Sequence, residues 1–96
     1  MKAPNNTKGG AWCVPQPGVS YVQLQANIDY ACGHGIDCGP IQYGGACFEP
    51  NTVISHAAYA MNLYYQTLGR YPWNCDFSHS AMLSSSNPSK FGSRHV

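Results

Sequence analysis

The chain has 96 residues and a mass of 10.4 kDa, which allows one small domain and excludes a second. Charged residues are only 9% of the sequence and the formal net charge is +1, so we expect no nucleic-acid partner, which would require a clustered basic face. Five cysteines, seven tyrosines, ten glycines and seven prolines are instead typical of a secreted, loop-rich domain that disulfides stabilise.

The chain divides into a short leader and one domain. Residues 1–11 are predicted to be a flexible leader or linker, and residues 12–96 the domain itself. Lys2 is not followed by an apolar stretch, so we expect no signal peptide in these residues. No apolar run approaches the roughly eighteen residues of a membrane helix, and we expect no membrane partner.

A first helix is predicted between Ser20 and Gly33. Ser20 and Gln23 have the spacing of a capping box, and Gly33 can end a helix in the left-handed conformation. Apolar residues then recur at helical spacing, at Tyr21, Leu24, Ile28 and Ala31 or Cys32. Asp29 falls in the last turn, where its charge opposes the helix dipole. It is either solvated, paired with a residue such as Arg70, or placed for a ligand.

The middle of the chain is predicted to contain a hairpin and a second helix. Gly44-Gly45 between residues 41–43 and 46–48 suits a two-residue hairpin turn. Asn51 or Thr52 then caps a helix that continues to about Leu68 and is closed by Gly69. Beyond it, residues 73–77 are predicted to be a strand and residues 84–89 a loop.

The second helix is apolar over more than half of its circumference, with a polar stripe on the remainder. The stripe contains Ser55, His56, Tyr59, Asn62 and Gln66. Tyr59 lies three and seven residues before Asn62 and Gln66, so these three side chains share a face that we expect to meet solvent. Tyr64 and Tyr65 point 100° apart, so at least one of them is expected to be partly exposed.

Neither metal binding nor catalysis is favoured by the sequence. Cys32, His34 and Cys38 lack a second pair of ligands at the spacing of a structural zinc site, so no metal or other cofactor is expected. Glycoside hydrolysis needs two carboxylates about 5 to 9.5 Å apart. The chain offers only Asp29, Asp37, Glu49 and Asp76, and no catalytic residues are assigned.

Tyrosines beside amides are instead suited to a sugar, because an aromatic face covers the C–H side of a pyranose while amides bond its hydroxyls. The first candidates for carbohydrate binding are Tyr59, Asn62 and Gln66. The surrounding candidates are Tyr30, Tyr65, Trp73 and Asp29.

Several blocks of the sequence together resemble the plant family 43 carbohydrate-binding modules. They are WCVP at 12–15, NIDYACG at 27–33, DCGPI at 37–41, GGACFEPNTV at 44–53, HAAY at 56–59, YYQ at 64–66 and CDF at 75–77. The resemblance implies a small α+β domain with two helices, a small antiparallel sheet and long disulfide-tied loops. It also implies binding of β-1,3-glucan such as callose or laminarin, in the apoplast or cell wall.

The resemblance further implies a disulfide pairing. Cys13 is expected to pair with Cys75 and Cys32 with Cys38, which leaves Cys47 as a free thiol. The family has a sixth cysteine near the position where this chain has Arg94. We therefore expect a monomer that Cys47 can link into covalent dimers, and a mobile tail after about residue 83.

The function predicted from these observations is non-catalytic binding of β-1,3-glucan, which targets a glucanase or wall protein to its polysaccharide. The alternative is a small secreted structural or interaction domain with little affinity for sugar.

Overall fold

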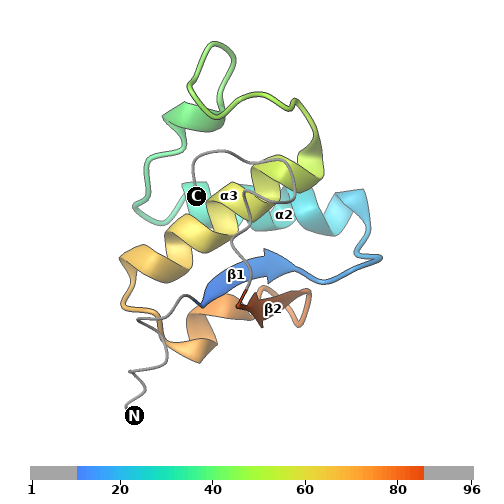
Figure 1. Ribbon diagram of the computed structural model, residues 1–96, viewed down its shortest axis with the longest axis vertical. Helices are drawn as coiled ribbons and strands as arrows, with labels where there is room; N and C mark the ends of the chain where they lie inside the picture. Colours follow the sequence, from blue (N-terminus) through green and yellow to red (C-terminus); the bar gives the residue numbers. More distant parts are fainter. Residues whose placement is uncertain (1–10, 86–96) are drawn as a thin grey trace.

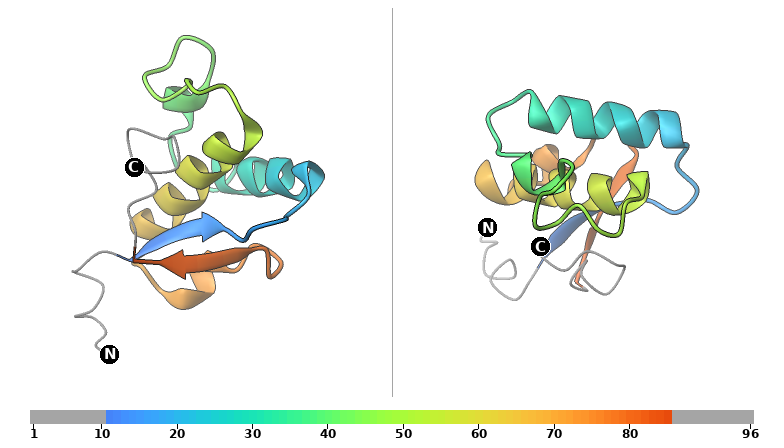
Figure 2. Two further views of the ribbon diagram at one scale, coloured as in Figure 1. Left: turned by 45° about the vertical axis from the view of Figure 1, so that its right-hand side comes forward. Right: turned by 90° about the horizontal axis from the view of Figure 1, so that it is seen from above.

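Helix α3 (Val53–Thr67) lies at the centre of the fold in the computed structural model, which describes residues 11–85. Helix α2 (Tyr21–Cys32) packs along one side of α3, and strand β1 (Trp12–Pro15) packs against another. Figures 1 and 2 show that α2 and the strands approach α3 from different sides. Most of the circumference of α3 is therefore covered by protein.

The sheet joins the beginning of the described chain to its end. Strand β1 pairs antiparallel with strand β2 (Ala81–Ser84), from Trp12 opposite Ser84 to Pro15 opposite Ala81. Figure 2 shows the two strands side by side. With two helices, one antiparallel sheet and two disulfides, the predicted fold class is confirmed.

Both predicted helices are present, and their N-terminal caps are those that the sequence indicates. The hydroxyl oxygens of Ser20 and Thr52 accept hydrogen bonds from the backbone N–H groups of Gln23 and Ser55. Gly69 follows α3 with a φ of +101°, which favours glycine. Gly33 has a φ of −86°, so the prediction of a left-handed residue there was wrong.

The predicted hairpin around Gly44-Gly45 is wrong. The chain forms the short 3₁₀-helix η1 (Gly39–Ile41) and a series of turns instead. The backbone N–H of Cys47 donates to the carbonyl of Pro40 (2.7 Å), and a Cβ on Gly45 would lie 2.4 Å from the carbonyl oxygen of Gly39. Gly45 is therefore needed because two backbone segments meet, and it does not make the turn of a hairpin.

The predicted strand at residues 73–77 is also wrong. This segment begins as the 3₁₀-helix η2 (Pro72–Cys75), because proline is well placed in the first turn of a helix. Three successive residues, none of them glycine, then have positive φ: Phe77, Ser78 and His79. Such a turn costs about 1–3 kcal/mol for each residue and needs support from its surroundings.

The two disulfides connect Cys13 with Cys75 and Cys32 with Cys38, as the family resemblance implied. The first attaches η2 to β1, and the second closes the loop after α2. Cys47 is a buried free cysteine, and burial raises the pKa of its thiol. Arg94, residues 1–10 of the predicted leader at 1–11, and the part of the predicted tail that follows residue 85 lie outside the described residues.

Candidate functional site

The polar stripe of α3 is not the exposed face that the sequence predicted. Tyr59, Asn62 and Tyr65 are 8%, 4% and 1% exposed, and Ser55 is buried as well. The interpretation of Tyr59, Asn62 and Tyr65 as an accessible sugar face is therefore corrected, because β1, α2 and the loop after η1 cover α3. Burial raises the pKa values of both tyrosines above that of a free phenol.

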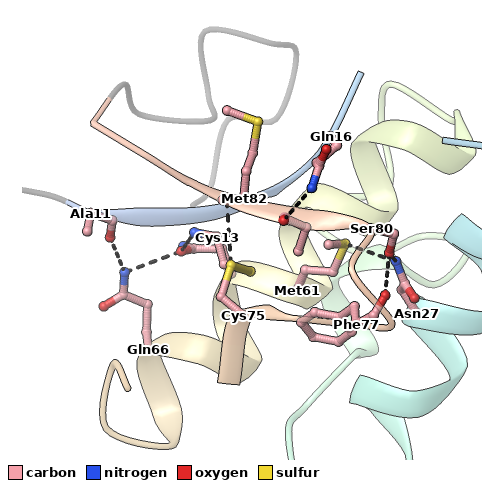
Figure 3. The surroundings of a disulfide bond; sticks show 12 residues. Ala11, Cys13, Gln16, Asn27, Met61, Gln66, Cys75, Phe77, Ser80 and Met82 are labelled. Carbon is pink, nitrogen blue, oxygen red and sulfur yellow. Dashed lines mark hydrogen bonds between the residues drawn. A yellow bond between two sulfur atoms is a disulfide. The ribbon is translucent and has the colours of Figure 1, made fainter. Parts of the chain in front are cut away.

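The polar side chains of this stripe form hydrogen bonds to the backbone of other segments. Asn62 Oδ1 accepts from the backbone N–H of Cys13 (3.0 Å), and Gln66 Nε2 donates to the carbonyl of Ala11 (3.1 Å). Figure 3 shows the contact between Gln66 and Ala11, just before β1. At the other end of α3, His56 Nε2 donates to the carbonyl of Phe48 (2.7 Å). Backbone groups outside a regular ladder need such partners when they are buried.

A groove with a volume of about 430 Å³ lies elsewhere, between α2 and the chain that follows α3. This volume is within the range of about 300–1,000 Å³ that is usual for ligand pockets. Its lining residues come from α2, the end of α3, η2 and the turn after it: Gln23, Ala26, Asn27, Tyr30, Tyr64, Trp73, Asn74, Asp76, Phe77 and Ser78. Two of the predicted candidates, Tyr30 and Trp73, are among them and are 48% and 70% exposed.

Aromatic rings support Tyr30 from several sides. The rings of Tyr64 and Phe77 meet it edge to face at 5.6 and 6.1 Å between centroids. His34 stacks on it at 4.0 Å, with ring nitrogen Nδ1 2.5 Å from the carbonyl oxygen of Tyr30. The hydroxyl of Tyr64 donates to that of Tyr30, and this bond, with burial, raises the pKa of Tyr64 to about 12. Tyr30 is thus a half-exposed ring held by its neighbours.

A polar network connects the groove to the left-handed turn. The amide of Gln23 donates to Asn27 Oδ1, and Asn27 Nδ2 donates to the hydroxyl oxygen of Ser80, both at 2.8 Å. Ser80 in turn donates to the carbonyl of Phe77 (2.5 Å) (Figure 3). The buried Asn27 therefore supports the strained backbone that places Phe77 and Ser78 in the groove.

The charges at the groove are suited to a neutral polar ligand. Asp76 is the one carboxylate among the lining residues, and its Oδ1 lies 3.2 Å from Nδ1 of His79, in a largely exposed contact. Asp29 lies outside the lining, where its carboxylate accepts from Gln25 Nε2 (3.0 Å). The groove thus lacks the second carboxylate that glycoside hydrolysis needs.

No group of three or more His, Cys, Asp or Glu side chains within residues 11–85 could hold a metal ion. Over the same residues, no helix is long and apolar enough to cross a membrane.

Several of the groove residues that sequence reasoning missed come from the segment after α3. This segment was predicted to be a strand, in which successive side chains point to opposite faces, so the prediction did not bring Asn74, Asp76 and Phe77 together at one site. The motif Cys75-Asp76-Phe77 marked the segment as important without indicating where it lay. The groove residues Gln23 and Tyr64 appeared only as helix positions in the sequence.

These features define the class of the protein: a small disulfide-stabilised binding module with an aromatic and amide-lined groove. The X8 domain family matches residues 11–82, and the chain belongs to this family, which is carbohydrate-binding module family 43. The resemblance identified from the sequence is thereby confirmed. The X8 domain is a binding module and not a catalytic domain.

Curated relatives have high identity over most of this chain. A glucan endo-1,3-beta-D-glucosidase of Olea europaea is 69% identical over 86 residues, which are 90% of this chain and 19% of that protein. The major pollen allergen Ole e 10 of Olea europaea is 57% identical over 79 residues, 81% of this chain and 64% of the allergen. Plasmodesmata callose-binding protein 3 of Arabidopsis thaliana is 52% identical over 69 residues, 72% of this chain and 38% of that protein. This chain thus spans less than two thirds of each relative.

Proposed function

We propose that this chain binds β-1,3-glucan without catalysis, through the groove between α2 and the segment after α3. The observation that carries the proposal is the groove itself, where exposed Tyr30 and Trp73 stand beside the amides of Gln23 and Asn74. Aromatic rings can cover the apolar face of a pyranose while amides and a carboxylate bond its hydroxyls. The names of the relatives, a glucan endo-1,3-beta-D-glucosidase and a callose-binding protein, favour the β-1,3-linked polymer.

The setting of this activity is part of the proposal. We infer that the module targets a glucanase or a wall protein to its polysaccharide in the apoplast or cell wall. Two disulfides support an oxidising compartment, because such bonds are rare in the cytosol.

We further propose that the module acts as a monomer. Cys47 is buried and its thiol pKa is raised, so little reactive thiolate is present at neutral pH. Covalent dimers through Cys47 would then form only when the surrounding loop opens.

An NMR titration of the oxidised domain with a soluble β-1,3-gluco-oligosaccharide tests the function, with a cello-oligosaccharide as the control. We expect saturable amide shifts for the β-1,3 ligand, centred on Tyr30, Trp73 and Asn74. Amide shifts that are larger at Tyr59 and Asn62 than at the groove residues would contradict the proposed site. A dispersed spectrum without shifts would contradict the function and favour the alternative, a structural or interaction domain with little affinity for sugar.

A further inference from the structure

We propose that Tyr71 is a positioning residue for Trp73, the most exposed ring of the groove. Tyr71 does not itself line the groove. Its ring covers one face of the indole and thereby holds the opposite face in place for a ligand. This inference rests on the proposed function, because an oriented indole matters for binding only if the groove receives a ligand.

The first observation is the geometry of the two rings. The centroids of Tyr71 and Trp73 lie 4.7 Å apart, and the ring planes differ by only 5°. Both side chains are exposed, with Tyr71 at 50%, so the pair is not forced together by burial in the core. No other aromatic ring of residues 11–85 stacks on Trp73. Tyr71 is therefore the aromatic group that restrains the indole.

The second observation is the space that Gly69 provides for Tyr71. A Cβ at residue 69 would lie 2.6 Å from Cε2 of Tyr71, which is closer than real Cβ contacts. Gly69 and Arg70 have φ values of +101° and +63°, so two successive left-handed residues turn the chain after α3. This turn leads Tyr71 back over Gly69, and the ring thus lies close to the backbone at Gly69 as well as on the indole of Trp73.

The third observation is that the backbone of η2 is already fixed. The backbone N–H of Asn74 donates to the carbonyl of Tyr71 (2.8 Å), and its Nδ2 donates to the carbonyl of Leu68 (3.2 Å). Cys75 is attached to Cys13 of β1. Because the main chain is held by these bonds, the freedom that remains at Trp73 is in its side chain, which Tyr71 limits.

An indole that is oriented before binding loses less side-chain entropy when a sugar stacks on it. Tyr71 should therefore raise affinity without touching the ligand. A stacked aromatic pair is worth about 0.5–1.5 kcal/mol, which corresponds to a change in Kd of about 2- to 12-fold.

The test compares the Kd of a β-1,3-gluco-hexaose, measured by calorimetry, for Tyr71→Ala, Tyr71→Phe, Trp73→Ala and the double variant Tyr71→Ala/Trp73→Ala. Tyr71→Ala should weaken binding about 3- to 10-fold, and Tyr71→Phe, which keeps the ring, should bind like the unmodified domain. In the Trp73→Ala background, Tyr71→Ala should have no further effect. Tyr21→Ala, which removes an exposed tyrosine outside the groove, is the matched control.

A spectroscopic measurement separates positioning from general stability. In a Trp12→Phe background, Trp73 is the sole tryptophan of the chain. Tyr71→Ala should then increase the fast motion of the indole in fluorescence anisotropy decay without ligand, while the far-UV CD spectrum stays unchanged. Gly69→Ala is a second variant that should displace the Tyr71 ring and have the same effect.

Three results would overturn the inference: an unchanged Kd for Tyr71→Ala, an equal loss in the Trp73→Ala background, or an unchanged anisotropy decay. An equal loss in that background would mean that Tyr71 contacts the sugar directly. If the unmodified domain binds no β-1,3-glucan, the proposed function fails, whereas the anisotropy decay still decides whether Tyr71 orders the indole.

Discussion

Two regions of this molecule carry tyrosines beside amides, and they serve different purposes. On α3, Tyr59 and Asn62 are buried, and Asn62 bonds to the backbone of β1. At the groove, Tyr30 and Trp73 are open to solvent beside Gln23 and other polar residues. The same residue types therefore support the fold in one region and are available to a ligand in the other.

A polar stripe on a helix therefore does not by itself indicate exposure. In a domain with few regular elements, loops must bury backbone groups that lack partners in a ladder, and helix side chains can supply those partners. Asn62, Gln66 and His56 do so on α3. Exposed rings with few internal polar bonds are the better indication of a binding surface.

The largest effect is expected from removing the disulfide that attaches η2, and with it the groove, to β1. Replacing Cys13 and Cys75 by Ala opens a loop with a sequence separation of 62, and the unfolding free energy should fall by about 4 kcal/mol. Urea unfolding followed by CD measures this change in the unfolding free energy. The matched control, Cys32→Ala/Cys38→Ala, opens a loop with a separation of only 6 and should cost about 2.4 kcal/mol. Equal losses of unfolding free energy in the two variants would contradict the expected dependence on loop length.

Tyr59→Ala should destabilise the fold by about 3 kcal/mol, because it leaves a cavity in the core beside Cys47 and Ala60. Its folded fraction should bind β-1,3-gluco-oligosaccharide with unchanged Kd. The sequence alone, which places Tyr59 on an exposed face as a first candidate for carbohydrate binding, implies the reverse, a weaker affinity with an unchanged fold. Thermal unfolding and calorimetry on the same sample distinguish the two expectations, with Tyr59→Phe as the conservative control.

Trp73→Ala should have the opposite profile. Binding should weaken about 10-fold, because exposed tryptophans that contact a ligand often contribute more than 1 kcal/mol. Stability should fall by no more than about 0.5–1.5 kcal/mol, the worth of the stacked pair with Tyr71, since the side chain is 70% exposed. A loss of stability without a loss of affinity would remove Trp73 from the site.

An effect confined to high pH concerns Tyr64, which connects the two regions through its hydrogen bond to Tyr30. Its folded pKa of about 12 lies above the ordinary value of 10, so the protonated phenol is favoured in the folded state. This contribution to stability is complete below pH 10 and is lost as the pH rises through 12. Tyr64→Phe should therefore show a smaller decrease in stability between pH 10 and 12 than the unmodified domain.

This comparison should be made in a Cys47→Ala background, because a thiolate at high pH can attack the disulfides. Denaturant midpoints at several pH values measure the slope. An identical slope in the two proteins would mean that Tyr64 does not titrate with a raised pKa.

Both helices could be predicted from the sequence, since their caps and apolar spacing depend on neighbouring residues. Ser20 and Thr52 are capping residues in the structure, and the helices end next to Gly33 and just before Gly69. Its motifs also identified the X8 family. These signals are local, and they do not depend on the tertiary contacts of the residues that carry them.

Tertiary packing determines which side of each helix is exposed to solvent and where the groove lies. Tyr59 is part of the core because distant segments cover α3. Trp73 lines the groove because the disulfide to Cys13 attaches η2 to β1, and the groove then lies between this segment and α2. The strands likewise pair residues about seventy positions apart, such as Trp12 and Ser84. Such contacts depend on the whole arrangement, because burial is a property of everything that surrounds a side chain and not of its own sequence neighbourhood.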